Sequence, residues 1–220
     1  MKLSDLSIDR IVSSLFEENA YLVRLSTRTD CVVVDPGLDP DAIIEHLERE
    51  GLTPAALLIT HGHSDHVAGN AALKTRWPEC PLVIGEADAE KLTDPQLNLS
   101  AAFGLPLRSP PADRTVVDGE VFEAAGLSIR VLEIPGHSRG HVVYLVEATE
   151  PPVVFVGDVI FAGGIGRTDF PDGDTQALLD GIHRKLFTLP EATILYPGHG
   201  PDTTVGHEKE FNPFVGRRST

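Results

Sequence analysis

Cysteine is nearly absent from this sequence of 220 residues, which contains only Cys31 and Cys80. Neither has the spacing of a zinc knuckle or a redox pair, so we expect both thiols to be reduced and structural. Long apolar runs are absent too. No stretch approaches the roughly 20 apolar residues needed to cross a bilayer, and the first residues lack the apolar core of a signal peptide. These absences argue against a membrane partner and predict a soluble, cytoplasmic protein.

Basic side chains are also scarce, because 18 Lys and Arg stand against 33 Asp and Glu, which gives a formal net charge of −15. Nucleic-acid surfaces are built from clustered Lys and Arg that neutralise phosphates, so this balance argues against a nucleic-acid partner. A hydrophobic content of 41% is enough for one substantial core. Without a linker, repeat or low-complexity run, residues 1–220 are predicted to form a single α/β domain, and nothing indicates an oligomeric state.

The six residues from His61 to His66 contain three histidines together with Asp65. They follow an apolar run at 55–59, which predicts a buried strand, and α/β proteins often place sites where a strand ends. In an extended segment alternate side chains share a side, so His61, His63 and Asp65 lean one way, while His66 turns elsewhere. Core packing explains three adjacent imidazoles poorly, since each buried ring must satisfy two nitrogens, whereas a metal satisfies one directly.

Three more ligand-type residues, His137, Asp158 and His199, each follow a predicted strand in the second half of the chain. A glycine directly precedes each of them, which removes a side chain where backbone must approach closely. With the first cluster they form a set of five histidines and two aspartates. Such a set suits zinc, and also manganese or iron, and two metals need about that many ligands. The candidate metal ligands are His61, His63, Asp65, His66, His137, Asp158 and His199.

Several polar residues outside this set have their own interpretations. Asp35 follows a β-branched run, and it could either cap a turn or accept a hydrogen bond from a ligand histidine. His141 is expected to support the site rather than to bind metal. Ser64 lies inside the first cluster, but no free base stands beside it, so it is predicted to cap a helix and not to act as a nucleophile. The surface is expected to hold His46, His183 and His207.

Apolar periodicity predicts the remaining elements. Helices are expected over 39–50, 65–77 and 174–187. Strands are expected at 6–13, 20–26, 31–34, 55–60, 82–84, 127–133, 141–147, 153–157 and 193–195. Residues 93–112 form a loop long enough to cover a site. Each half of the chain mixes strands with covering helices, so we expect two sheets packed together with helices outside.

The motifs Thr60-His-Gly-His-Ser-Asp-His66, Pro135-Gly136-His137, Gly157-Asp158 and Pro197-Gly198-His199 occur in this order. Together they resemble the metallo-β-lactamase superfamily over most of the chain. The resemblance implies an αββα sandwich of two mixed β-sheets flanked by helices, with a metal site at the sheet edges. It also implies a division of the ligands. One metal would be held by His61, His63 and His137, the other by Asp65, His66 and His199, with Asp158 bridging them.

Within that superfamily, the segments Gly157–Phe161, Gly166–Phe170 and Pro197–Gly200 resemble the short glyoxalase II-like hydrolases. This resemblance implies a dinuclear thioesterase that cleaves S-lactoylglutathione or related acyl thioesters, with Asp65 and Asp158 as catalytic residues. Zinc lowers the pKa of bound water from about 15.7 to roughly 7, so a metal-bound hydroxide would be available at neutral pH.

The thiol carrier of such a substrate is an anion, so a chain of net charge −15 needs local cations to bind it. Arg167 in the motif loop and Arg139 beside His137 are the predicted substrate-binding residues, with further candidates in the tail at Lys209, Arg217 and Arg218. An ion pair between Arg167 and the neighbouring Asp169 is the competing interpretation of that arginine.

A persulfide dioxygenase of the same superfamily is the alternative, and Gly166-Arg167-Thr168-Asp169 resembles that class as well. Such an enzyme uses a single iron. The iron would be held by His61 and Asp158 together with either His63 or His137, and the family pattern favours His137. A non-catalytic domain in which zinc only staples the sheets is a third interpretation, which a turnover assay on metal-loaded protein would separate from the other two.

Overall fold

The structure is a computed structural model that describes residues 1–217. Two six-stranded mixed sheets form its centre. The first sheet runs in the order β1 (Leu6–Val12), β2 (Asn19–Leu25), β3 (Asp30–Val34), β4 (Thr53–Ile59), β5 (Leu82–Gly85) and β6 (Arg114–Val116). The second runs in the order β14 (Thr203–Thr204), β13 (Ile194–Pro197), β10 (Val153–Gly157), β9 (Val142–Val146), β8 (Leu127–Glu133) and β7 (Val121–Ala124).

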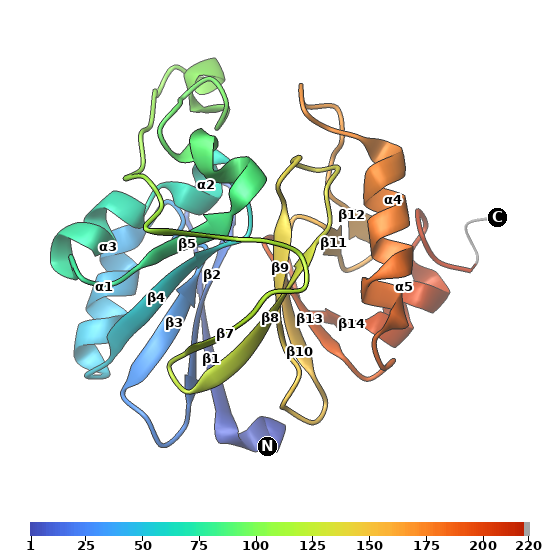
Figure 1. Ribbon diagram of the computed structural model, residues 1–220, viewed down its shortest axis with the longest axis horizontal. Helices are drawn as coiled ribbons and strands as arrows, with labels where there is room; N and C mark the ends of the chain where they lie inside the picture. The colour runs from blue at the N-terminus through green and yellow to red at the C-terminus, as the bar shows by residue number, and fades with distance from the viewer. Residues whose placement is uncertain (218–220) are drawn as a thin grey trace.

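Helices cover the outer face of each sheet (Figure 1). The first sheet carries α1 (Pro40–Arg49) and α3 (Asn70–Arg76), and the second carries α4 (Thr175–Arg184) and α5 (Val205–Phe211). The remaining elements are short: α2 (Ser64–Val67), the hairpin β11 (Ile160–Phe161) and β12 (Gly164–Ile165), and the 3-10 helices η1 (Leu3–Asp5), η2 (Glu86–Leu92), η3 (Ser100–Phe103) and η4 (Leu186–Thr188). The predicted αββα sandwich is therefore confirmed.

Three apolar clusters hold the layers together. One lies between the sheets and includes Tyr144 and Phe155, one joins the first sheet to Ile43 and Leu47 of α1, and one joins the second sheet to Leu178 of α4. Full burial of a side chain of this size contributes about 1.5–3 kcal/mol, so the layered core supplies most of the stabilisation. No helix within residues 1–217 is long and apolar enough to cross a membrane.

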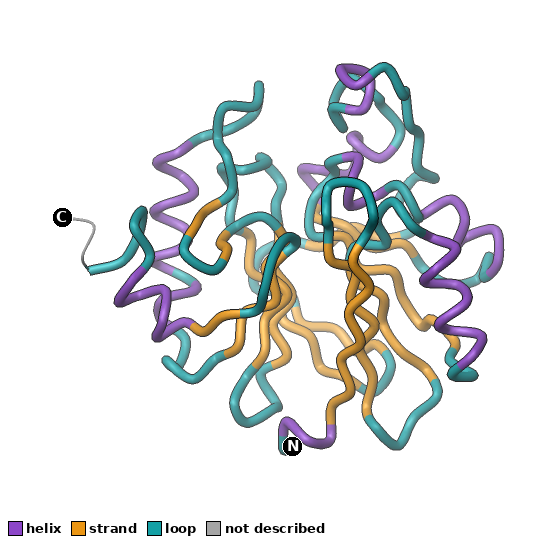
Figure 2. The backbone as a smooth tube through the Cα atoms, turned by 180° about the vertical axis from the view of Figure 1, so that it is seen from behind, coloured by secondary structure: helices purple, strands orange, loops and turns teal. Residues whose placement is uncertain are grey.

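Loops from both sheets meet where β4, β10 and β13 end, at the edge seen from behind in Figure 2 as a row of loops above the strands. Backbone hydrogen bonds join them directly: the N–H of Val142 donates to the carbonyl of Thr60 at 2.9 Å, and that of Gly198 to Gly157 at 2.8 Å. The approach is close, because a Cβ on Gly157 would lie 2.4 Å from Thr60 Oγ1. The glycine before Asp158 is thus required sterically.

The predicted helix over 65–77 is wrong, because the chain forms α2 and α3 with a break at Ala68-Gly69. The N–H of Gly69 donates to the carbonyl of Pro36 at 2.7 Å rather than to a helical partner, and a Cβ there would lie 2.4 Å from that oxygen. The predicted cap at Ser64 is also wrong. His63 is the N-cap residue of α2 and makes no side-chain cap, while the N–H of Ser64 donates to Asn98 at 3.0 Å.

Candidate metal centre

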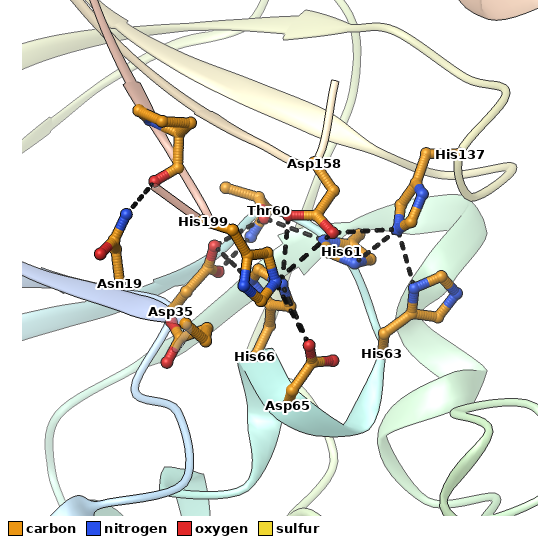
Figure 3. Close-up of polar contacts among 12 residues, drawn as sticks. Asn19, Asp35, Thr60, His61, His63, Asp65, His66, His137, Asp158 and His199 are labelled. Carbon is orange, nitrogen blue, oxygen red and sulfur yellow. Dashed lines mark hydrogen bonds and ion pairs between the residues drawn. The ribbon is translucent and has the colours of Figure 1, made fainter. Parts of the chain in front are cut away.

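One group of imidazoles forms around His61, His63 and His137, which come from the loops after β4 and β8 (Figure 3). All three rings are buried. The Nε2 atom of His137 lies 3.2 Å from His61 Nε2 and 2.9 Å from His63 Nδ1, so three nitrogens converge on one point. Burial lowers the pKa of each ring, which keeps all three imidazoles neutral and able to act as ligands.

Acceptors around these rings determine which nitrogen carries the proton. The carbonyl of Arg167 lies 2.9 Å from His137 Nδ1 and can only accept, so Nδ1 of that ring is the donor. The hydroxyl of Thr60 donates to Asp35 at 2.7 Å, so its oxygen accepts from His61 Nδ1 at 3.1 Å. Both Nε2 atoms therefore face each other as lone pairs at 3.2 Å.

That arrangement is repulsive unless a cation lies between the rings. Two nitrogens bound to one zinc at about 2.0–2.1 Å lie roughly 3.3 Å apart in a tetrahedral site. The observed separation of 3.2 Å between the Nε2 atoms of His61 and His137 fits that geometry. The chemistry of this donor set thus fits a divalent metal.

A second group contains Asp65, His66 and His199, whose ligand atoms lie within 4.8 Å of one another. Asp65 Oδ2 is 3.8 Å from His66 Nε2 and 3.4 Å from His199 Nε2. The Nδ1 atom of His199 donates to the carbonyl of Phe16 at 3.0 Å, and that of His66 to Asp35 at 3.1 Å. These bonds fix both tautomers and leave each Nε2 free to bind a metal.

Asp158 lies between the two groups (Figure 3). Its Oδ2 is 3.5 Å from His137 Nε2, and its Oδ1 is 3.4 Å from His66 Nε2. Burial alone would raise the pKa of Asp158, but the imidazole of His66, with those of His137 and His199, holds it well below its usual range. His66 Nε2 and Asp158 Oδ1 are buried and lack a hydrogen-bond partner within residues 1–217. These unpaired atoms are what a bound metal would satisfy.

Asp35 forms hydrogen bonds that support both groups of ligand-type residues. Its Oδ1 accepts from the N–H of Thr60 at 2.7 Å, and its Oδ2 accepts from the Thr60 hydroxyl and from His66. The carboxylate therefore orients His66 directly and His61 through the Thr60 hydroxyl. The backbone of Asp35 has a φ of +48°, which few residues other than glycine adopt and which Asp tolerates. Of the two interpretations of Asp35, the structure shows the hydrogen-bond acceptor of a ligand-type histidine.

His141 supports ligand-type residues without being one of them. Its Nε2 accepts the backbone N–H of Asp158 at 3.1 Å, and its ring stacks on His61 with 4.7 Å between centroids.

Glu18 is buried near the second group, where burial raises its pKa well above the usual range although His66 opposes the shift. A Cβ on Gly37 would overlap its carboxyl oxygen. Glu18 stands between the predicted strands 6–13 and 20–26, a position typical of an exposed turn, so this buried acid was missed.

A buried lysine network connects the loops of the first group, and sequence reasoning missed it too. Asp88 accepts from the N–H groups of Gly62 and Gly140 at 2.8 and 2.9 Å, and also from the Ser138 hydroxyl. Lys91 lies 3.4 Å from Asp88, and it donates to Ser138 and to Asp172. The only sequence signal is an Asp-Lys pair spaced by three residues, which is common on exposed helices.

One cavity of about 380 Å³ lies beside the metal centre, and it is bordered by five of the seven ligand-type residues: His63, Asp65, His137, Asp158 and His199. Arg167 lines it, with a bidentate ion pair to Asp169 at 2.7 Å for each contact. The competing interpretation of Arg167 as a partner of Asp169 is therefore correct, although the residue also borders the cavity.

The other predicted cations lie away from this cavity. Arg139 is paired with Glu90 and lines a smaller neighbouring pocket. Lys209 and Arg217 are not part of the cavity lining, and Arg218 lies outside the described residues.

The fold and this double cluster define a class: a two-sheet α/β sandwich with groups that could hold divalent metals at the shared sheet edge. A family model described as "Metallo-beta-lactamase superfamily" matches residues 14–199. The chain belongs to the metallo-β-lactamase superfamily.

Similar proteins and solved structures have names that describe different activities or metals. Hydroxyacylglutathione hydrolase GloC of Haemophilus influenzae is 36% identical over 217 residues, which cover 97% of this chain and 100% of that protein. The crystal structure of BLEG-1 B3 metallo-beta-lactamase is 37% identical, with a TM-score of 0.90 over 95% of this chain and 99% of that one. The crystal structure of TTHA1623 in a di-iron-bound form is 36% identical, with a TM-score of 0.82 over 94% and 100%.

Proposed function

We propose that this protein is a dinuclear metal-dependent thioesterase of the glyoxalase II type, which hydrolyses S-lactoylglutathione or related acyl thioesters. The observation that carries the proposal is the position of Asp158 between two groups of ligand-type side chains, within 3.5 Å of an imidazole in each. The similarity to GloC supports the thioester as substrate, and the di-iron form of TTHA1623 supports two metals.

His61, His63 and His137 would hold one metal, Asp65, His66 and His199 the other, with Asp158 between them. Divalent metals there would supply Lewis acidity and lower the pKa of a coordinated water to roughly 7. The chain orients these ligands through Thr60 and Asp35, and through the carbonyls of Phe16 and Arg167. Ser64 borders the cavity, but no base among residues 1–217 is paired with its hydroxyl, so these residues offer no activated serine there. A thiolate is a good leaving group because the pKa of the corresponding thiol is low, so the leaving sulfur does not need to be protonated first.

An iron-dependent persulfide dioxygenase is the second candidate function. The motif at Gly166-Arg167-Thr168-Asp169 favours it. The geometry also offers a single-metal set, because His137 lies 3.2 Å from His61 and 3.5 Å from Asp158.

The two candidates are separated by running two assays on one metal-loaded preparation. We expect hydrolysis of S-lactoylglutathione or of another acyl thioester, and no oxygen uptake with glutathione persulfide. A parallel assay with a chromogenic cephalosporin measures β-lactamase activity, the activity for which BLEG-1 is named. We expect hydrolysis of the cephalosporin to be far weaker than hydrolysis of the thioester. Oxygen consumption without thioester cleavage would transfer the assignment to the dioxygenase.

A further inference from the structure

The cavity beside the metal centre has apolar walls. Its lining outside the ligand-type residues is mostly Phe16, Leu99, Phe103, Phe161, Ile165 and Phe170. These side chains come from four separate segments of the chain: the β1–β2 turn, the region around η3, the β11–β12 hairpin and the loop before α4. Convergence of four aromatic rings on one cavity from separate segments points to an apolar ligand group rather than to a chance patch.

Phe16 and Phe103 form the outer rim of the cavity. Their rings meet edge to face with 5.7 Å between centroids, yet the two residues remain 49% and 61% exposed. Phe16 and the next residue, Glu17, both have left-handed backbones, with φ of +69° and +54°. Non-glycine residues adopt this conformation at a cost, and such strain concentrates at functional sites. The same turn directs the Phe16 carbonyl to His199 Nδ1, so it places the aromatic wall and orients a ligand-type histidine together.

Aromatic rings also stand directly against the metal centre. Phe170 contacts His63 and His137, with centroids 5.0 and 5.6 Å apart, and Phe161 lies 6.1 Å from His199. An acyl group whose carbonyl lies at the metal centre would therefore extend between these phenylalanines. Contact of this kind favours flat or branched apolar groups over a small hydroxylated group such as lactoyl.

Basic side chains without an acidic partner are what the described residues of this cavity lack. Arg167 is the one Lys or Arg among the described residues in its lining. Its Nε and Nη2 donate to Asp169 at 2.7 Å, and its Cζ lies 4.5 Å from the centroid of the Phe170 ring. In the adjoining pocket, Lys91 is paired with Asp172 and Arg139 with Glu90. Among the described residues that line the two pockets, an anionic carrier such as glutathione thus meets no Lys or Arg that lacks an acidic partner, on a chain of net charge −15.

We propose that the substrates are acyl thioesters with an aromatic or branched apolar acyl group, and that an anionic thiol carrier adds nothing to their recognition. This inference rests on the proposed thioesterase function and narrows its substrate class. The reaction is hydrolysis: the acyl carbon–sulfur bond of the thioester breaks and a bond forms between that carbon and the oxygen of water. The products are a carboxylate, a thiol and a proton, and no oxidant is needed.

The test is a two-by-two set of substrates with metal-loaded full-length protein. Benzoyl and lactoyl groups are each placed on glutathione and on the uncharged thiol N-acetylcysteamine, and kcat/KM is measured for all four. We expect benzoyl to exceed lactoyl by roughly 10-fold to 100-fold on either carrier, the range that burying a phenyl group can supply. For a given acyl group we expect glutathione to give no increase over N-acetylcysteamine.

Phe103→Ala tests the rim without touching a ligand-type residue, and because Phe103 is 61% exposed we expect the variant to fold. We expect it to lower kcat/KM for the benzoyl substrates several-fold more than for the lactoyl substrates, mostly through KM. Leu105→Ala is the matched control, because Leu105 lies two residues further along, is 71% exposed and is outside the cavity lining. It should leave all four values unchanged.

Higher kcat/KM for S-lactoylglutathione than for both benzoyl substrates would overturn the apolar preference and leave the thioesterase standing. An equal loss on all four substrates in Phe103→Ala would overturn the role of the aromatic rim. Failure of the metal-loaded protein to hydrolyse any of the four would overturn the thioesterase function itself, and the substrate class with it.

Discussion

Replacement of Asp158 by asparagine is expected to abolish most of the activity and to lower the metal content. The carboxylate stands between the two groups of ligand-type residues and is held ionised by the imidazoles around it. An amide is a poorer ligand and carries no charge to offset two cations. The loss should therefore exceed the roughly 10-fold to 100-fold that is typical when only a supporting hydrogen-bond partner is removed.

Asp35→Asn is the matched comparison for that experiment, since it makes the same chemical change one layer further out. Asparagine has one acceptor oxygen in place of two, so it cannot accept all three hydrogen bonds that the carboxylate accepts, two from Thr60 and one from His66. A loss of roughly 10-fold to 100-fold is expected here. Metal analysis and thioester hydrolysis on the same preparations compare the two variants. Equal and negligible effects at both positions would mean that the site lies elsewhere.

Lys91→Met is expected to cause the largest loss of stability among single changes outside the metal centre. Lys91 is 2% exposed, and its ammonium faces Asp88 and Asp172. Methionine fills a similar volume but leaves the buried Asp88 carboxylate without its cation, a change that typically costs about 3–5 kcal/mol. The loop of Gly62 should loosen as well, because the N–H of Gly62 donates to Asp88 at 2.8 Å.

Denaturant unfolding of metal-loaded protein measures this effect, with Lys185→Met as the control. Lys185 forms an ion pair with Asp118 at 2.8 Å, but both side chains are partly exposed, at 31% and 49%. Exposed pairs contribute about 0.2–1 kcal/mol, so the control should lose little. Similar unfolding midpoints for the two variants would contradict a central role for the Lys91 network.

Features encoded locally were predictable from the sequence. The glycines before Asp158 and His199 mark close backbone approach, and in the structure a Cβ on Gly198 would lie 2.4 Å from Asp158 Oδ1. Strands with dense β-branched runs also emerged as expected, since their pattern depends on neighbouring residues alone. The convergence of ligand-type residues from both halves followed from their shared position after strands.

Features created by distant contacts were not predictable. The helix break at Gly69 depends on a hydrogen bond to Pro36, which lies in a different loop. Burial of Lys91 depends on Ser138 and Asp172, which are 47 and 81 residues away. Arg139 was predicted to bind substrate because it stands beside His137, but its guanidinium is turned towards Glu90. Sequence proximity does not determine where a long side chain points.

The number of metals bound per chain distinguishes a dinuclear hydrolase from an enzyme with a single iron. Two metals would need all seven side chains as ligands, and the structure brings the seven together in two groups with Asp158 between them. Elemental analysis of purified protein, combined with an iron-specific spectrum, should give close to two divalent metals per chain. One iron per chain, with the group of Asp65, His66 and His199 left without a metal, would contradict the dinuclear hydrolase.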